Sequence, residues 1–498
     1  MKKYIRNILF IGLLASCSLD KDPISDFSEV TIGGSSAGEG YATKAEMQTQ
    51  YDAIYTLVKN NMQESWMLDI FAHAEIRSDN AYAGSTGAIA FLEDHGQDAT
   101  HSIVLRDWNF YLRGINTANI VIANVDEVPD AALTVTERVQ WKAEAMIFKA
   151  WLLFDMVRLW GDLPIPPIEV PEITSSNVEE TYAQLFPPRT PTAQVYDEII
   201  ENLEYGRVNA PGINTADKFL FSKTVAKALL AKVYAEKPKR DYAKTIQYCT
   251  EVEADGVTLV SDFSDLFGFD TATMDVRARH TSESIFEIAY DAGGSNWLWM
   301  MFGKNAANPA STYAWSKWVT PSRDIIAAFD AEGDTVRKGE SILQDAVSWS
   351  NYYPGDQYQF MYKVRSSLNS VIKLRLADIL LLKAEAYAAT GDLQSAAALV
   401  NQIRARVHLP ALASSITADQ DAMKGAVLNE RRLELAFEGH RWFDLVRNDK
   451  AIEVMNSLNS RDSGRLPMRR TIDENALLYP VPLSEIEKNP NLVQNAGY

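Results

Sequence analysis

The stretch that most constrains the fold of this chain is residues 430–447, ERRLELAFEGHRWFDLVR, because it combines a helical period with dense charge. Apolar residues recur there, and upstream from Met423, at steps of three and four, as on one face of a helix. Glu430, Glu434 and Glu438 fall on a neighbouring stripe at i, i+4 and i+8. Stacked carboxylates repel one another, so each needs a cation or a hydrogen-bond donor if the stripe faces inward.

Arginines that could form ion pairs with these carboxylates are found at positions 404, 406, 431, 432, 441 and 447. Gly439 is predicted to end the helix in the left-handed conformation that glycine adopts without strain, and His440 begins a new direction. We therefore predict a buried, ion-paired corner that fixes geometry rather than performing chemistry.

Helical periods dominate the rest of the chain, and strand-like runs such as 284–290 are short and scattered. The predicted helices are 44–59, 103–125, 137–160, 192–205, 221–235, 242–252, 376–390, 393–407 and 421–438. This pattern indicates a mainly α fold.

Two helix pairs, 376–407 and 221–252, are similar to tetratricopeptide units. In the clearer pair, small residues allow close approach, Gly391 and Asp392 make the turn, and two apolar side chains face the partner helix. These are Ala384, Ala388 and Ala396, then Leu399 and Ile403. The looser pair turns at 237–239. Such pairs need neighbours to cover their apolar faces, so we expect a stack of several, with 137–160 in another pair.

Segment 161–191 contains seven prolines, at positions 164, 166, 167, 171, 187, 188 and 191. Proline removes a backbone donor and disrupts helix interiors, so we predict an extended crossing without a helix.

Residues 430–447 resemble the most diagnostic segment of the SusD/RagB family of outer-membrane nutrient-binding lipoproteins. Four further segments agree in the family's order: 150–166, 196–203, 374–407 and 478–498. The resemblance implies one SusD-like domain over 41–498 without a boundary at the proline-rich segment. Its tetratricopeptide-like helices would cover about 103–160, 192–254 and 374–407, and a less regular, loop-rich ligand-side segment about 256–370.

The N-terminus reads as a lipoprotein signal peptide over residues 1–16, with Lys2, Lys3 and Arg6 before an apolar run at 8–14. Residues 14–17, LASC, have the form of a lipobox, which predicts acylation of Cys17 and attachment to a bilayer. The polar segment 17–40 suits a flexible tether. Its Asp20 and Asp22 resemble the signal that sends such lipoproteins to the cell surface.

The number of cysteines and the net charge limit which disulfides and which binding partners are expected. Once Cys17 is acylated, Cys249 is the only cysteine left, so it is predicted to be a small apolar packing residue with no disulfide. Removing residues 1–16 moves the formal net charge from -18 to -21. Such an acidic protein is not expected to bind nucleic acid or anionic lipid, whereas the charge says nothing about a neutral sugar.

Aromatic residues are densest between 296 and 318, among small polar residues with neither a helical nor a strand period. The candidate ligand-binding residues are Trp297, Trp299, Tyr313, Trp315 and Trp318. Sugar rings stack their C–H faces on such side chains. The same side chains could instead fill the irregular half of the fold or form a protein interface.

Two further candidate regions are the polar loop 75–82, EIRSDNAY, and the aromatic run 108–111. They supply the candidates Arg77, Asp79, Asn80, Tyr82 and Trp108. The resemblance implies that a loop after the first helices, the start of the next helix and the later aromatic segment form one ligand surface. The loop is equally compatible with a simple turn.

No catalytic motif stands in a fitting context: residues 34–38 match the G-x-S-x-G string of serine hydrolases, but no apolar strand precedes them and no helix directly follows. The six histidines lack metal-ligand spacing, so neither a metal nor a cofactor is predicted, although a glycosidase carboxylate pair is defined by spatial separation rather than by spacing. By resemblance, the leading hypothesis is a non-enzymatic outer-membrane lipoprotein, facing the cell exterior, that binds an oligosaccharide or glycan. It would deliver this ligand to a TonB-dependent SusC-like barrel. The alternatives are a glycan-cleaving enzyme and a peptide-binding helical-repeat scaffold.

Overall fold

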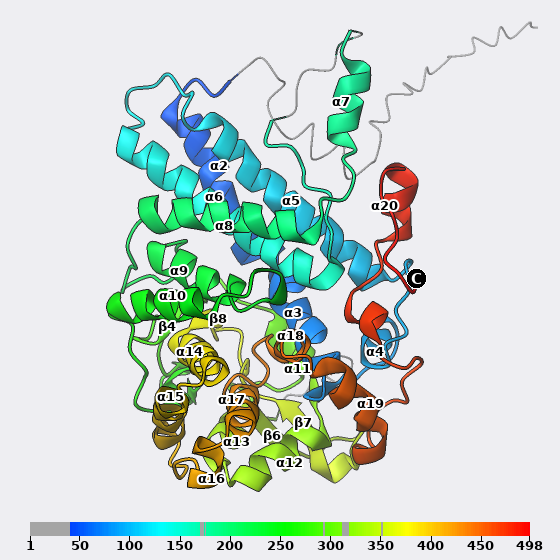
Figure 1. Ribbon diagram of the computed structural model, residues 1–498. Helices are drawn as coiled ribbons and strands as arrows, with labels where there is room; N and C mark the ends of the chain where they lie inside the picture. Colours follow the sequence, from blue (N-terminus) through cyan, green and yellow to red (C-terminus); the bar gives the residue numbers. More distant parts are fainter. Residues whose placement is uncertain (1–39, 170–173, 175, 292–293, 311–317, 350–351) are drawn as a thin grey trace, which may run out of the picture.

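The computed structural model describes residues 40–169, 174, 176–291, 294–310, 318–349 and 352–498 (Figure 1). The predicted signal peptide, Cys17 and residues 18–39 of the predicted tether lie outside these ranges. No helix within them is both long and apolar enough to span a bilayer.

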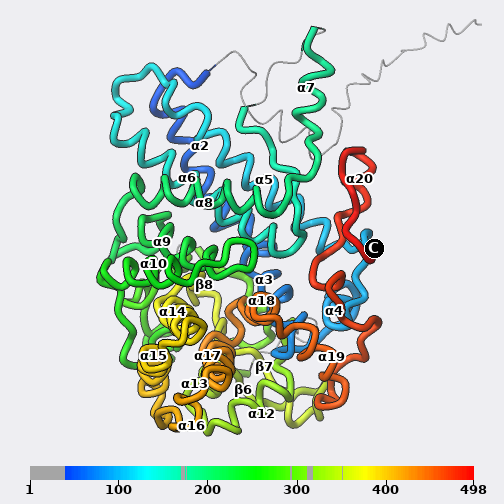
Figure 2. The backbone as a smooth tube through the Cα atoms, in the orientation of Figure 1, coloured from blue at the N-terminus to red at the C-terminus, as the bar shows by residue number. Residues whose placement is uncertain are grey.

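The long helices form a stack in which each packs on the next (Figures 1 and 2). They are α2 (Lys44–Thr56), α5 (Ser102–Asn124), α6 (Val135–Trp160), α8 (Thr192–Asn209), α9 (Lys223–Val233), α10 (Tyr242–Ala254), α14 (Leu376–Thr390), α15 (Leu393–Arg406) and α17 (Gln420–Glu434). Contacts run from α2 through α5, α6, α8, α9 and α10 to α14, which packs against α15 and α17. The predicted mainly α fold of stacked, tetratricopeptide-like helix pairs is confirmed.

The turn between α14 and α15 forms as the sequence predicts. Gly391 has φ +89°, in the left-handed region, and the Asp392 side chain accepts a hydrogen bond from the Ser395 N–H at 3.1 Å. Ala384, Ala388 and Ala396 are fully buried, so the two helices approach closely. The looser pair, α9 and α10, turns at the 3₁₀ helix η4 (Lys237–Lys239), and Cys249 is a buried free thiol.

Shorter elements make up the rest of the chain. The helices are α3 (Asp69–Phe71), α4 (Ala88–Glu93), α7 (Val178–Leu185), α11 (Leu298–Phe302), α12 (Arg323–Glu332), α13 (Thr335–Ser341), α16 (Ser414–Thr417), α18 (Arg441–Arg447), α19 (Ala451–Arg461) and α20 (Leu483–Lys488). Three π-helical pieces, η1 (Leu57–Asn61), η2 (Gln63–Leu68) and η3 (Ala72–Ile76), follow α2. The remaining 3₁₀ helices are η5 (Phe263–Asp265), η6 (Gly355–Gln357) and η7 (Glu474–Leu477).

The strands pair into antiparallel, two-stranded sheets. The pairs are β1 (Ala81–Tyr82) with β5 (Thr320–Pro321), β2 (Phe269–Asp270) with β3 (Asp275–Val276), β4 (Ser284–Ile288) with β8 (Val371–Arg375), and β6 (Ile342–Asp345) with β7 (Tyr358–Met361). The strand predicted near 284–290 is therefore confirmed as β4.

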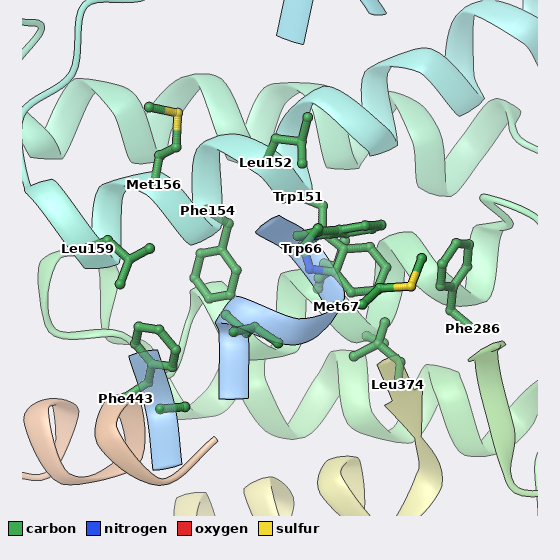
Figure 3. Packing of buried hydrophobic residues seen from close by; sticks show 14 of the residues in the cluster. Trp66, Met67, Trp151, Leu152, Phe154, Met156, Leu159, Phe286, Leu374 and Phe443 are labelled. Carbon is green, nitrogen blue, oxygen red and sulfur yellow. The ribbon is translucent and has the colours of Figure 1, made fainter. Parts of the chain in front are cut away.

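The hydrophobic core continues from the helical stack into the β4–β8 sheet. Trp66 of η2 packs edge-on against Trp151 of α6, with ring centroids 5.0 Å apart, and lies near Phe286 of β4 (Figure 3). Its indole N–H donates to Asp155 at 2.8 Å, so the buried polar atom is satisfied.

The helix predicted to run to Glu438 ends at Glu434 instead. In a continuing helix the Glu434 carbonyl would accept from the Glu438 N–H, but here it accepts from the side chains of Arg375 (2.8 Å) and Lys363 (3.2 Å). Phe437 takes a left-handed conformation with φ 61° before Gly439 takes one with φ 85°, and α18 starts at Arg441. The predicted left-handed glycine is confirmed, whereas the predicted helix end is wrong by one turn.

The proline-rich segment contains a helix, which contradicts the prediction of an extended crossing throughout. All seven prolines lie outside 172–186, and α7 forms within this proline-free interval. Figure 1 shows α7 projecting from the helical stack.

Candidate functional site

The pairing of β1 with β5 brings together two of the three regions predicted to form a ligand surface. Tyr82 lies opposite Thr320. The Ser322 N–H donates to the Asn80 carbonyl at 2.9 Å, and the Ser322 hydroxyl donates to the Asp79 carbonyl at 2.6 Å. The polar loop 75–82 is thereby fixed beside the end of the aromatic segment.

Asp79 and Asn80 are buried in this loop and are occupied by protein partners. Arg441 forms a bidentate contact with the Asp79 carboxylate at 2.8 and 2.9 Å, and Arg432 approaches it at 3.1 Å. Burial alone raises the pKa of Asp79, but the guanidiniums of Arg432 and Arg441 outweigh it and hold this pKa well below its usual range. Asn80 donates to Glu75 at 2.7 Å and accepts from Arg432 at 2.9 Å.

Arg77 and Trp108 are also enclosed. The Arg77 guanidinium lies 4.3 Å from the centre of the Trp442 ring and 4.1 Å from that of Tyr479, and it donates to the Ala476 carbonyl at 2.8 Å. Trp108 has no exposed surface and packs edge-on against Trp160 at 5.4 Å. In this conformation Arg77, Asp79, Asn80 and Trp108 are buried in the scaffold and offer no surface to a ligand, so their direct contact with a ligand stays an untested prediction.

Tyr82 is buried too, but it supports a more exposed surface. Its hydroxyl donates to Asp462 at 2.7 Å, and its ring stacks on Tyr352 with centroids 4.7 Å apart and planes 7° apart. Burial, followed by the Asp462 carboxylate, raises the pKa of Tyr82 well above its usual value, so the hydroxyl stays a donor. Tyr82 therefore packs beneath Tyr352 and supports it from below, without itself being exposed.

The aromatic residues of the later segment differ in exposure. Trp299 is buried in α11, whereas Trp297, which precedes α11, and Trp318 are half-buried. The Trp318 N–H donates to the Met301 carbonyl at 2.8 Å, which holds Trp318 against the end of this helix. Tyr313 and Trp315 lie outside the described residues.

A group of half-buried aromatic residues, here called the aromatic patch, comprises Trp318, Trp349, Tyr352 and Tyr353. Trp349 and Tyr353 both pack edge-on against Tyr358 of β7, at 4.9 and 6.1 Å between ring centroids. The Tyr358 hydroxyl in turn lies 2.6 Å from that of Thr320, two residues after Trp318. Residues 349–353 are not among the ligand-binding residues predicted above, because aromatic density peaks at 296–318; the run WSNYY was the available signal.

Arg323, the first residue of α12, lies within the aromatic patch. Its guanidinium is 4.4 Å from the centre of the Tyr353 ring and donates to the Tyr352 carbonyl at 2.6 Å and to the Tyr82 hydroxyl at 3.3 Å. Half-exposed rings beside fixed polar groups are suited to binding a sugar, which presents C–H faces and hydroxyls together.

Elsewhere, a chain of buried polar groups has the components of an acid–base relay. His73 bonds to Asp107 at 2.7 Å and to the Tyr479 hydroxyl at 2.8 Å. Burial lowers the pKa of His73 to about 4 and raises that of Asp107 to about 7. All three side chains are fully buried, so no substrate reaches them in this conformation. Their observed contacts join η3, α5 and the C-terminal segment, residues 474–498.

Two cavities lined by described residues, of about 10 and 30 Å³, are too small for a sugar. One of about 30 Å³ lies between Lys232, Lys373, Asp155 and His440, which is room for one or two water molecules. Among the described residues no cluster of three or more potential metal ligands occurs.

Comparison with known proteins adds to this geometry. The sequence profile of the SusD family matches residues 349–498, and a second profile, described as starch-binding associating with outer membrane, matches residues 30–235. This chain belongs to the SusD family. Two SusD-like proteins of Formosa agariphila, P38 and P2, are each 26% identical to it; the alignments cover 99% and 100% of this chain and 97% and 100% of those proteins.

Solved structures of SusD-like proteins share the fold. A laminarin-binding SusD-like protein superposes with a TM-score of 0.70 at 24% identity, over 92% of this chain and 100% of that one. Surface glycan-binding protein A from Bacteroides fluxus superposes with a TM-score of 0.72 at 22% identity, with the same coverage.

Proposed function

We propose that this SusD-family protein is a non-catalytic receptor that binds an oligosaccharide or glycan and delivers it to a TonB-dependent SusC-like barrel. We place it on the exterior of the outer membrane, attached through acylated Cys17. The observation that carries the binding role is the aromatic patch, in which half-buried aromatic side chains lie beside Arg323. Laminarin binding and glycan binding in the names of two structural neighbours favour a sugar over a peptide.

The ligand-binding residues in this proposal are the patch and the adjoining aromatic segment. Stacking on a sugar requires an aromatic side chain that is at least partly exposed, which favours the half-buried residues Trp349, Tyr352, Tyr353, Trp318 and Trp297. Tyr313 and Trp315 remain candidates from the sequence. Tyr82, Asp79 and Asn80 act indirectly, because they position β1 beneath the patch.

Isothermal titration with a library of neutral and acidic oligosaccharides tests the binding role. We expect Trp349→Ala to lower affinity by about tenfold or more, since an aromatic contact in a binding site contributes about 1–3 kcal/mol. Trp297→Ala and Trp315→Ala test the neighbouring segment. Tyr182→Ala, which truncates an exposed ring on α7, is the matched control and should bind normally. Release of cleaved product during titration would instead favour the enzyme alternative.

The proposed barrel contact rests on a second surface, here called the apolar corner. Five of the eight exposed large apolar residues in the described chain belong to the proline-rich segment and the C-terminal segment: Ile168, Val178, Tyr182, Leu483 and Val493. These segments are joined, because Asn491 donates to the Phe186 carbonyl at 2.8 Å and Arg189 to the Val493 carbonyl at 2.8 Å.

Charge favours a protein over an anionic lipid surface as the occupant of the apolar corner. Between Arg158 and Arg189 the chain has no Lys or Arg, and it has acidic residues at positions 162, 169, 172, 179 and 180. Phospholipid headgroups that carry negative charge would repel such a segment. Figure 1 places α7 and α12, whose first residue is Arg323, at different ends of the molecule, which suits a lid that hinges at one end and holds ligand at the other.

Co-purification with the barrel from detergent-solubilised outer membranes tests this contact. Combining Val178→Ser with Tyr182→Ser should abolish co-purification and leave sugar binding intact. Val135→Ser removes an exposed apolar residue at the start of α6, outside the apolar corner, and should change neither. If wild-type protein captures no barrel, the delivery role is excluded. In the same membranes, Cys17→Ala should move the protein out of the membrane fraction.

A further inference from the structure

Arg323 forms no salt bridge with a carboxylate among the described residues, although the Asp462 carboxylate lies near enough to help raise the pKa of Arg323. Its guanidinium contacts the Tyr82 hydroxyl, the Tyr352 carbonyl and the Tyr353 ring, all of which are uncharged. The neighbouring arginines differ: Arg432 pairs with Asp324 at 2.7 Å, and Arg461 pairs with the same carboxylate at 2.8 Å.

The acids around the patch, apart from the exposed Asp356, are engaged by other partners. Asp324 is held by Arg432 and Arg461, and Asp462 accepts from the Tyr82 hydroxyl. Glu93 accepts from the Ala83 N–H, the Leu466 N–H and the Tyr352 hydroxyl. Asp356 is exposed on η6. At physiological ionic strength charges more than about 8 Å apart are largely screened, so the groups beside Arg323, among them Asp462, affect a bound anion more than the acidic net charge of the chain does.

The position of Arg323 is fixed by its surroundings. A Cβ atom at Gly464 would lie 1.7 Å from Nη1 of Arg323 and 2.8 Å from the Tyr82 hydroxyl, so the guanidinium occupies space that only glycine leaves. Two of its five N–H donors are engaged by the contacts above. The half-exposed side chain therefore presents further donors beside the rings of the patch.

A planar guanidinium with free donors is the side chain best matched to a carboxylate or a sulfate group. An aromatic ring beside it would hold the sugar ring that carries the anion. We infer that Arg323 binds an anionic substituent, carboxylate or sulfate, on a sugar stacked on the aromatic patch, which makes the ligand an acidic glycan. This inference rests on the proposed function and names its substrate class.

Titration calorimetry with matched pairs of sugars tests it. The probes are oligogalacturonate beside its carboxyl-reduced form, and a sulfated galactan fragment beside its desulfated form. Wild-type protein should bind at least one acidic member about tenfold to a hundredfold more tightly than its neutral match, as expected for a charge-assisted contact. The preference should weaken as salt is raised.

Arg323→Gln should remove most of this preference, because it should lower the affinity for the acidic member much more than the affinity for the neutral member. Arg469→Gln, which removes an exposed arginine that pairs with Asp94, should bind as wild type does. Arg323→Lys keeps the positive charge but lacks the planar guanidinium with its paired N–H donors. It should therefore retain part of the preference for the acidic sugar, which provides a second test if the glutamine variant does not fold. Gly464→Ala should also weaken acidic binding, because it displaces the guanidinium.

The two proposals fail in distinguishable ways. Wild-type protein that binds neutral sugars as tightly as acidic ones overturns the role of Arg323 and leaves the receptor intact. Equal losses for both sugars in Arg323→Gln show a merely structural role and also overturn it. Wild-type protein that binds no oligosaccharide overturns the receptor and, with it, this inference.

Discussion

At the scale of single residues, the kind of partner decides what burial does to a carboxyl group. Burial by itself raises the pKa of Glu434, but Arg406, Arg375 and Arg337 outweigh it and hold the pKa well below its ordinary value. Glu144 is almost as buried, yet its partners are the hydroxyls of Tyr51 and Tyr55, which are neutral. Burial therefore prevails and raises the pKa of Glu144 to about 7.

Glu144→Gln should flatten the pH dependence of stability. Between pH 4.5 and about 7 this carboxyl is ionised in the unfolded chain but protonated in the folded protein, so wild-type stability falls as pH rises through that window. The shift corresponds to at most about 3 kcal/mol. The variant should match wild type near pH 4.5 and exceed it at pH 8.

Urea denaturation at both pH values measures this difference. Asp107, whose pKa also lies near 7, should leave a residual slope in the variant. Parallel pH profiles for variant and wild type would show that Glu144 does not titrate in this window.

At the scale of elements, two glycines within helices have opposite environments. Gly206 of α8 lies where that helix crosses α6, and an added Cβ would be 2.4 Å from Cγ1 of Ile147. Gly425 of α17 is exposed, and an added Cβ would meet nothing within 4 Å. The absence of a side chain at Gly206 therefore allows α6 and α8 to lie close together, whereas Gly425 does not affect helix packing.

The same substitution at these two positions should change stability in opposite directions. Gly206→Ala is expected to lower the free energy of unfolding, because overpacking costs about 1–3 kcal/mol and the gain in helix propensity is at most about 1 kcal/mol. Gly425→Ala should raise it by about 0.5–1 kcal/mol. The denaturation midpoints of the two variants test this prediction. A stabilised Gly206→Ala would mean that α6 and α8 leave room for an added methyl group.

At the scale of the whole molecule, an ion network joins the helical stack to the loop-rich half. Arg375 at the end of β8 contacts Glu434 of α17 at 2.6 Å, Glu438 at 2.6 Å and Glu283, which precedes β4, at 2.8 Å. Arg337 of α13 contacts Glu430 at 2.7 Å, and Arg404 of α15 contacts the same carboxylate at 3.0 Å. The predicted buried, ion-paired corner is confirmed, and it connects four helices or strands that are distant in sequence.

Arg375→Ala should destabilise the protein by about 3–5 kcal/mol, because it leaves buried carboxylates without a counterion. We also expect the unfolding transition to broaden, as the loop-rich half loses its connection to α17. Circular dichroism and tryptophan fluorescence, followed together in urea, would detect this. Lys424→Ala, which removes an exposed pair with Asp421, is the control and should unfold as wild type does.

Local patterns in the chain were enough to predict most helices. The helix 376–390 coincides with α14, and the turn at Gly391 and Asp392 forms as expected, because helical period and capping chemistry act within a few residues. Alanines predicted to allow close approach are buried in the helix interface. Family membership also followed from motifs that are continuous in sequence.

Long-range contacts decided the remainder. The carbonyl of Glu434 accepts from Arg375 and Lys363, so α17 ends one turn early, and no local signal records those distant donors. Arg77, Asp79 and Asn80 looked like exposed loop residues but are buried, because β5 and the C-terminal segment cover them.

The sequence by itself therefore determined the helical elements, the corner that needs buried ion pairs and the family. Only the tertiary structure decided which cations fill that corner, and which aromatic side chains remain half-buried. The physical reason is that helix formation depends on neighbours a few residues apart. Burial of a side chain, in contrast, depends on which distant segments pack over it.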